Sequence, residues 1–217
     1  MTENFAQARE SMVLSQLRPN RVTSDRVADA MGEIPREQFV PKALRGVAYL
    51  DEDLEIAKNR YLIEPRVFGL MMQSADVKST DVVLDIACGS GYTSAVLGKL
   101  AQAVVAIDDQ EDLVESASQT LAGLEADNVA VISGDLEAGN AKQGPYNVIH
   151  INGAIDRVPQ VLFDQLAEGG RLVCVIGVNP GVAKLYVKSD GDIIARNLFD
   201  AEVPRLGAMR EEVKFSL

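Results

Sequence analysis

The sequence predicts an α/β fold built on a doubly wound, mostly parallel sheet. Two observations support this: apolar runs alternate with helical patterns from Asp81 onward, and a glycine-bearing turn follows the first run. The expected strands span residues 82–87, 103–107, 128–132, 146–151 and 170–177. The expected helices between them span residues 92–100, 110–124 and 159–166. Apolar strands separated by amphipathic helices are typical of a parallel sheet with helices on its faces.

The segments on either side of this core have a different character. Helices are expected over 6–17 and 24–31, followed by a proline-punctuated connector over 34–41 and a charged loop over 51–63. Pro65 is expected to open a helix that reaches Met72, because proline is tolerated in a first helical turn. Residues 182–187 and 193–198 flank the turn sequence Ser189-Asp190-Gly191-Asp192, which predicts an antiparallel hairpin.

These elements predict one domain over residues 1–217. Its parts are an N-terminal helical extension with a substrate-side loop (1–65), a cofactor-binding core (66–178) and C-terminal strands (179–217). A chain of 217 residues is long enough for one full α/β domain.

Composition limits the classes of function. The net charge of −11 opposes a nucleic acid partner, and no apolar stretch is long enough to span a membrane. The N-terminus lacks a basic region followed by an apolar core, and the two cysteines are expected to be reduced, so we expect a cytoplasmic protein. The single histidine, His150, lies in an apolar strand and is expected in the core or at its rim, and no metal site is predicted. The oligomeric state stays open.

The most informative segment joins the first core strand to the next helix. The strand ends in Asp85-Ile86-Ala87 and continues into Cys88-Gly89-Ser90-Gly91. Glycines there let the backbone approach a ligand, and the helix directs free N–H groups and its positive dipole end toward it. A dinucleotide fingerprint would require a third glycine where the chain has Ser94, so that class of site is not indicated.

Acidic residues follow two further strands. Asp108 ends the second core strand and is placed to accept hydrogen bonds from ribose hydroxyls, and Asp135 follows the third strand. Either residue alone could be a helix cap or turn residue. Acids at three successive strand ends disfavour phosphates and suit the ribose, adenine, amino group and sulfonium of S-adenosyl-L-methionine. The predicted cofactor-binding residues are Asp85, Ala87, Cys88, Gly89, Ser90, Gly91, Asp108, Asp109, Asp135 and Leu136.

Four segments, in order, resemble the protein-L-isoaspartate O-methyltransferase family over nearly the full chain. They are Arg9 to Leu17, Ile34 to Pro41 with Ala48 to Asp51 after it, the cofactor loop, and Val158 to Val173. The resemblance implies a Rossmann-like class I S-adenosylmethionine-dependent methyltransferase. It also implies methyl transfer to the α-carboxylate of isoaspartyl residues, in proteins or peptides that carry this damage. Since such a carboxylate is already ionised at neutral pH, no general base is required.

The chain departs from the family where acceptor and methyl donor would meet. Family members carry Gly-x-x-x-Thr-Ile-Ser-x-Pro, and their serine is the usual active-site residue. Aligned on Pro65, this chain has Tyr61 at the threonine position and Ile63 at the serine position. No catalytic residue is therefore assigned. Arg60 and Arg66 are the candidate contacts for an anion.

Three interpretations follow from this departure. In the first, the chain methylates isoaspartyl residues, and backbone N–H groups near Leu62 and Ile63 or one of the two arginines hold the carboxylate. In the second, it is a methyltransferase with a different acceptor, such as another carboxylate or a small molecule. In the third, it binds S-adenosylmethionine without turnover and serves as a sensor or interaction module. The retained cofactor motif separates the third from the others, and isoaspartyl specificity separates the first from the second.

Overall fold

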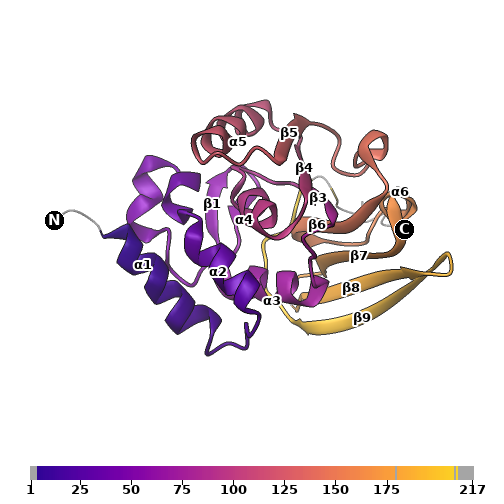
Figure 1. Ribbon diagram of the computed structural model, residues 1–217, viewed down its shortest axis with the longest axis horizontal. Coiled ribbons are helices and arrows are strands. Elements are labelled where there is room, and N and C mark those ends of the chain that lie inside the picture. Colours follow the sequence, from indigo (N-terminus) through magenta and orange to yellow (C-terminus); the bar gives the residue numbers. More distant parts are fainter. Residues whose placement is uncertain (1–3, 179, 208, 210–217) are drawn as a thin grey trace, which may run out of the picture.

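The computed structural model describes residues 4–178, 180–207 and 209. Within them one sheet has seven strands in the order β5-β4-β3-β6-β7-β8-β9. The strands are β3 (Val82–Ile86), β4 (Ala103–Asp108), β5 (Val129–Ser133), β6 (Tyr146–Ile155), β7 (Leu166–Ile176), β8 (Val182–Ser189) and β9 (Asp192–Asp200). β3 to β7 pair in parallel, whereas β8 and β9 continue the sheet as an antiparallel hairpin (Figure 1). The predicted mostly parallel sheet and terminal hairpin are confirmed.

The helices lie close to their predicted ranges. They are α1 (Phe5–Met12), α2 (Asp25–Glu33), α3 (Pro65–Ala75), α4 (Tyr92–Leu100), α5 (Glu111–Gly123) and α6 (Gln160–Asp164). A π-helical turn, Val13–Leu17, continues α1, so the helix expected over 6–17 changes its winding midway. The predicted 159–166 helix ends at Asp164, because β7 already begins at Leu166.

The charged loop over 51–63 contains a small hairpin. Its strands β1 (Leu54–Ala57) and β2 (Arg60–Leu62) pair antiparallel, and the register shifts by one residue beside the turn. Short 3₁₀ turns at Arg36–Phe39 and Lys42–Val47 precede this hairpin.

The core has two parts, one on each face of the sheet. Alternate residues along β3 serve the two faces: Val83 belongs to the cluster with α2, α3 and α4, whereas Leu84 belongs to the cluster with α6. Most helices cover the first face. Leu162 of α6 and Leu206, which follows β9, pack on the second face. Alternation of this kind is what the two-residue period of a strand produces.

The strand order reverses between β3 and β6. The chain moves outward from β3 to β4 and β5, and then returns to β6 on the other side of β3. Loops leaving the carboxyl ends of these two strands therefore diverge, and ligands of open α/β sheets bind in the crevice that this creates.

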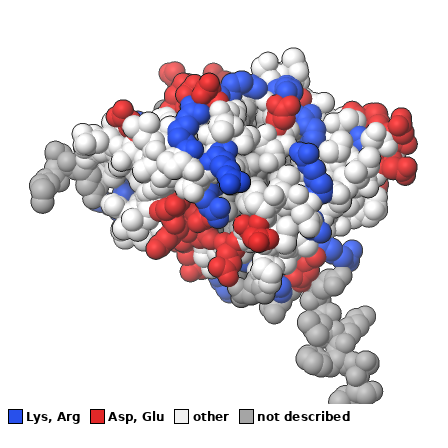
Figure 2. Space-filling model, turned by 90° about the horizontal axis from the view of Figure 1, so that it is seen from below, with Lys and Arg blue, Asp and Glu red and all other residues white. Residues whose placement is uncertain are grey.

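The surface carries its charge unevenly. Figure 2 shows one face on which Lys and Arg side chains run in streaks between acidic groups, although the chain has a net charge of −11. None of the helices described in the structure is long and apolar enough to cross a membrane.

Candidate functional site

The loop after β3 needs residues that tolerate the left-handed region. Ala87, Gly89 and Gly91 have φ values of +58°, +56° and +92°. A Cβ on Gly91 would also lie 3.1 Å from the Cβ of Ala117 in α5, so this position requires glycine both for its conformation and for its close packing. The loop ends where α4 begins at Tyr92, and the first turn of the helix directs its free N–H groups into the loop.

Asp85, which the sequence predicts to bind the cofactor, lies beneath this loop and is fully buried. Its carboxylate accepts hydrogen bonds from the hydroxyls of Thr93 (2.7 Å) and Ser94 (2.6 Å), and it lies 2.7 Å from Nδ1 of His150. Asp85 and His150 are register partners on the adjacent strands β3 and β6. The network joins the first turn of α4 to both strands, and it places His150 in the core, as expected.

Asp108, at the end of β4, is fully buried and faces the same loop. Its Oδ2 accepts from the backbone N–H of Gly89 at 2.9 Å, and its Oδ1 accepts from the N–H of Gln110 at 3.1 Å. The predicted ribose acceptor and the predicted glycine loop are therefore in direct contact, although 19 residues separate them in the chain.

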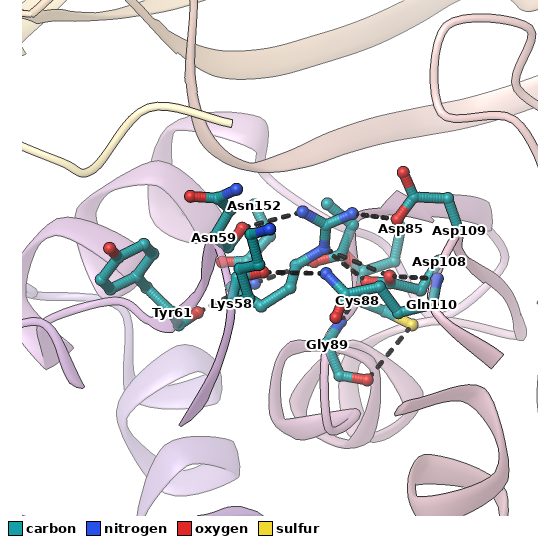
Figure 3. Close-up of polar contacts among 12 residues, drawn as sticks. Lys58, Asn59, Tyr61, Asp85, Cys88, Gly89, Asp108, Asp109, Gln110 and Asn152 are labelled. Atoms are coloured by element: carbon teal, nitrogen blue, oxygen red, sulfur yellow. Dashed lines mark hydrogen bonds and ion pairs between the residues drawn. The ribbon is translucent and has the colours of Figure 1, made fainter. Parts of the chain in front are cut away.

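The same carboxylate is paired with Arg60 of β2. Nε of Arg60 lies 2.9 Å from Oδ2 and 3.2 Å from Oδ1 of Asp108, and Nη2 forms an ion pair with Asp109. Nη1 donates to the carbonyl of Asn59 at 2.8 Å. Figure 3 shows the carboxylates of Asp108 and Asp109 facing the hairpin turn that carries Lys58 and Asn59. The sequence proposed Arg60 as an anion contact, and the structure places it against these two carboxylates.

The other loop residues have clear local roles. Cys88 is buried, and burial, followed by the charges of Asp85 and Asp108, raises the pKa of its thiol well above the usual value. It is therefore a poor nucleophile. The hydroxyl of Ser90 donates to the carbonyl of Phe39 at 2.5 Å and so ties the loop to the 3₁₀ turn that precedes the hairpin.

Asp135 and Leu136 lie at the end of β5. Asp135 is exposed, and its Oδ1 accepts hydrogen bonds from the backbone N–H groups of Glu137 (2.8 Å) and Ala138 (3.4 Å). It therefore caps a turn in this structure. Leu136 is buried in the same apolar cluster as Ile107, next to the end of β4.

The segment in which the sequence predicts a departure from the family motif turns its apolar side chains, Leu62 and Ile63, inward. Leu62 and Ile63 are each only 2% exposed, and the carbonyl of Ile63 accepts from Nη2 of Arg36 at 2.7 Å. Arg66 is partly exposed, and its Nη2 lies 3.4 Å from Oε1 of Glu64. The side chain of Ile63 thus packs in the hydrophobic core.

Asn152 was missed by reasoning from sequence. Its Nδ2 donates to the carbonyl of Ala87 in the loop at 3.1 Å and is 3.4 Å from the carbonyl of Tyr61 in β2. Its Oδ1 is buried and has no hydrogen-bond partner among the described residues. The signal was present, since a polar residue follows the apolar run of β6, but the sequence alone did not show that β6 lies beside β3.

These features fit an S-adenosyl nucleoside. A buried carboxylate at the end of β4 suits two ribose hydroxyls, the left-handed glycine loop leaves room for backbone contact, and the orphaned Oδ1 of Asn152 is an acceptor for a ligand N–H. Among the described residues, no cluster of three or more metal-ligating side chains is present.

Comparison with known proteins agrees with this geometry. Residues 8–203 match the model of the family described as protein-L-isoaspartate(D-aspartate) O-methyltransferase. A protein-L-isoaspartate O-methyltransferase of Synechococcus sp. is 41% identical over 179 residues, which cover 82% of this chain and 73% of that protein. One of Koribacter versatilis is 37% identical over 206 residues, covering 94% and 92% of the two chains.

Two solved structures are similar over most of the chain. A protein-L-isoaspartate O-methyltransferase structure superposes with a TM-score of 0.80 at 28% identity and covers 92% of this chain and 66% of its own. A Plasmodium falciparum structure in complex with S-adenosyl-L-homocysteine superposes with a TM-score of 0.79 at 22% identity and covers 95% and 99%. At 22% identity, the similarity to the Plasmodium falciparum structure shows a shared fold and no more.

Proposed function

Because the chain belongs to the protein-L-isoaspartate(D-aspartate) O-methyltransferase family, we propose that it methylates the carboxylate of isoaspartyl residues in damaged proteins and peptides. Its methyl donor is S-adenosyl-L-methionine. The observation that carries the proposal is the buried Asp108 carboxylate against the left-handed loop of Gly89 and Gly91, at the point where the strand order reverses.

The reaction asks little of side-chain acid–base chemistry. The cofactor supplies a methyl group on a positively charged sulfur. A new bond forms between that carbon and a carboxylate oxygen, the carbon–sulfur bond breaks, and its electron pair stays on sulfur. No proton moves, because the acceptor is already ionised at neutral pH. The chain must therefore align the two groups and exclude water, which can contribute up to roughly 7–11 kcal/mol.

Each part of the site has a proposed task. Asp108 holds the ribose hydroxyls, with Asp109 beside it, and the segment of Asp135 and Leu136 lies by the adenine. The backbone from Ala87 to Gly91 lines the methionine part, and Asp85 acts from beneath by fixing the first turn of α4. These tasks rest on the strand-end positions of the three acids and on the contacts of Asp85 and Asp108.

The acceptor carboxylate needs hydrogen-bond donors to replace its water. Ile63 offers none from its buried side chain, and Leu62 is equally buried. Of the two arginines, Arg60 lies against the cofactor loop, whereas Arg66 lies beside Glu64. Arg60 is therefore the stronger candidate.

The test is methyl transfer from radiolabelled S-adenosylmethionine to an isoaspartyl peptide, compared with the same peptide containing aspartate. Isomer-selective labelling is expected. Protein that binds the cofactor but labels neither peptide would refute the proposed acceptor, and would direct the search to other acceptors or to a binding role. Asp108→Ala should weaken cofactor binding by about 1–3 kcal/mol, because two ribose hydroxyls lose their acceptor. Unchanged affinity by calorimetry would contradict that task.

We also propose a cytoplasmic location. It is supported by the two cysteines, Cys88 and Cys174, which are both buried and unpaired in the described chain. Reduced thiols are usual in a reducing compartment.

A further inference from the structure

The guanidinium of Arg60 binds the carboxylate to which the proposed function assigns the ribose hydroxyls. Both oxygens of Asp108 accept from its Nε, and each also accepts one backbone N–H. Arg60 is only 2% exposed and Asp108 is fully buried, so the two form an ion pair that is shielded from water. Hydrogen bonds between two charged groups are stronger than those between neutral groups. Two ribose hydroxyls cannot bind this carboxylate while the arginine remains.

The hairpin that carries Arg60 is fastened over the loop at several points. The side chain of Gln110 donates to the carbonyl of Lys58 at 2.9 Å, and Ile56 packs so closely on Gly89 that a Cβ there would lie 3.0 Å from its Cδ1. The turn residue Asn59 has a φ of +56°, a conformation that asparagine tolerates, and its carbonyl accepts from Arg60. Several independent contacts thus hold the hairpin, and with it Arg60, against the loop.

The hairpin also borders the place where the acceptor must arrive. Asn152 donates to the carbonyls of Ala87 in the loop and Tyr61 in β2, so β2 lies beside the loop segment that lines the methionine part of the cofactor. Arg60 is the neighbour of Tyr61, and the next residues, Leu62 and Ile63, turn into the core. A guanidinium released from Asp108 would stay at this edge, where it can bind a carboxylate with two hydrogen bonds.

We propose that Arg60 is exchanged between two carboxylates: it holds Asp108 until the cofactor arrives, and then holds the carboxylate of the acceptor. The second half rests on the proposed function. The exchange makes binding ordered, with the cofactor first, because the acceptor's partner becomes available only when the ribose displaces it. It also supplies the donor that Ile63 cannot provide, and it makes Arg60 a specificity-determining residue for an anionic acceptor.

The experiment measures cofactor affinity and acceptor KM separately. The Kd of S-adenosylhomocysteine is measured by calorimetry without acceptor, and the KM and kcat for the isoaspartyl peptide are measured at saturating S-adenosylmethionine. In Arg60→Met the Kd should fall by about tenfold, because no bound state has to be displaced. The KM should rise by about tenfold or more, since a charged donor is lost. Arg18→Met, which removes a partly exposed arginine paired with Asp25 in the N-terminal region, should change neither.

Two further variants separate the exchange from a structural role. Arg60→Lys keeps one charge but not the two-carboxylate bridge, so it should tighten the cofactor and partly restore the acceptor KM. Gln110→Ala loosens the hairpin without touching Arg60 or the backbone N–H that binds Asp108. Its Kd should fall by a smaller factor while the acceptor KM stays the same. Faster amide hydrogen exchange over 58–60 in Gln110→Ala would show the loosening directly.

Each possible result supports or overturns one part of the proposal. A Kd in Arg60→Met that is unchanged or higher, in a variant that is folded by circular dichroism, would overturn the exchange at Asp108. A lower Kd with an unchanged acceptor KM would overturn the role at the acceptor. If the wild-type protein methylates no isoaspartyl peptide, the proposed function fails by itself. A lower Kd in Arg60→Met would then still support displacement of Arg60 by the cofactor.

Discussion

Arg36 is one of the largest fully buried side chains among the described residues, and replacing it tests how the acceptor side of the site is built. Its Nε donates to the carbonyl of Ala48 and its Nη2 to that of Ile63, both at 2.7 Å. Its Cζ lies 5.0 Å from the ring centroid of Tyr92, the first residue of α4. One side chain thus joins the 3₁₀ turn of residues 36–39, the segment before the hairpin, the segment after it, and α4.

We predict that Arg36→Met lowers the free energy of unfolding by about 3 kcal/mol. Each carbonyl that loses its donor in a buried site costs about 1–3 kcal/mol, and the cation–π contact adds about 1–2 kcal/mol. Methionine fills most of the volume and removes the cost of burying a charge, which offsets part of the loss. The same burial is the main cause that lowers the pKa of Arg36 below its ordinary value.

The measurement is urea unfolding followed by circular dichroism, with Arg18→Met as the matched control. The control removes the pair of a partly exposed arginine with the exposed Asp25 and should cost less than about 1 kcal/mol. For a domain of this size, a loss of about 3 kcal/mol lowers the Tm by roughly 6–12 °C. A loss below about 1 kcal/mol, with an unchanged denaturant slope, would refute the view that Arg36 supports the hairpin segment.

Three further predictions concern the cofactor loop and the cysteines. Ala87→Gly should raise the free energy of unfolding by about 0.5–1 kcal/mol in a urea titration, because alanine at a φ of +58° is strained and glycine is not; a loss of stability would contradict this. Gly91→Ala should cost about 1–3 kcal/mol in the same assay, since its new Cβ would crowd Ala117, and a neutral result would argue against the tight loop packing. Burial raises the pKa of both thiols, so iodoacetamide should modify Cys88 and Cys174 only after unfolding, and rapid labelling of native protein would show otherwise.

The sheet could be predicted because its signal is local. Each core strand is a short apolar run, and each is followed by a turn and a helical pattern, so element types and approximate bounds follow from the residues themselves. Some features of these elements were missed for physical reasons. β6 extends to Ile155, because residues beyond 151 still pair with β7. The turn Val13–Leu17 is π-helical, and a single wider turn leaves no distinct spacing in a sequence.

The site was only partly predictable, because its decisive contacts are long-range. The acids at strand ends were visible in the sequence, and parallel strands bring such residues to one edge. The pair of Asp85 with His150 depends on β3 and β6 being neighbours in a given register. The pair of Arg60 with Asp108 depends on how a small hairpin docks, across 48 residues of sequence. Neither can be read from spacing.

The apolar residue that the sequence predicts at the family serine position can be related to the position of Arg60. Serine at position 63 would need its side chain at the site, but here Ile63 contributes to the core and its carbonyl is fixed by Arg36. The segment therefore cannot turn a donor toward the acceptor without exposing buried apolar surface. Arg60 lies three residues earlier, on the strand that borders the loop, and it carries donors that already bind a carboxylate. Under the proposed function, a methyl transfer that needs no base still requires a donor for the acceptor carboxylate, and the guanidinium of Arg60 is the group that we propose for this task.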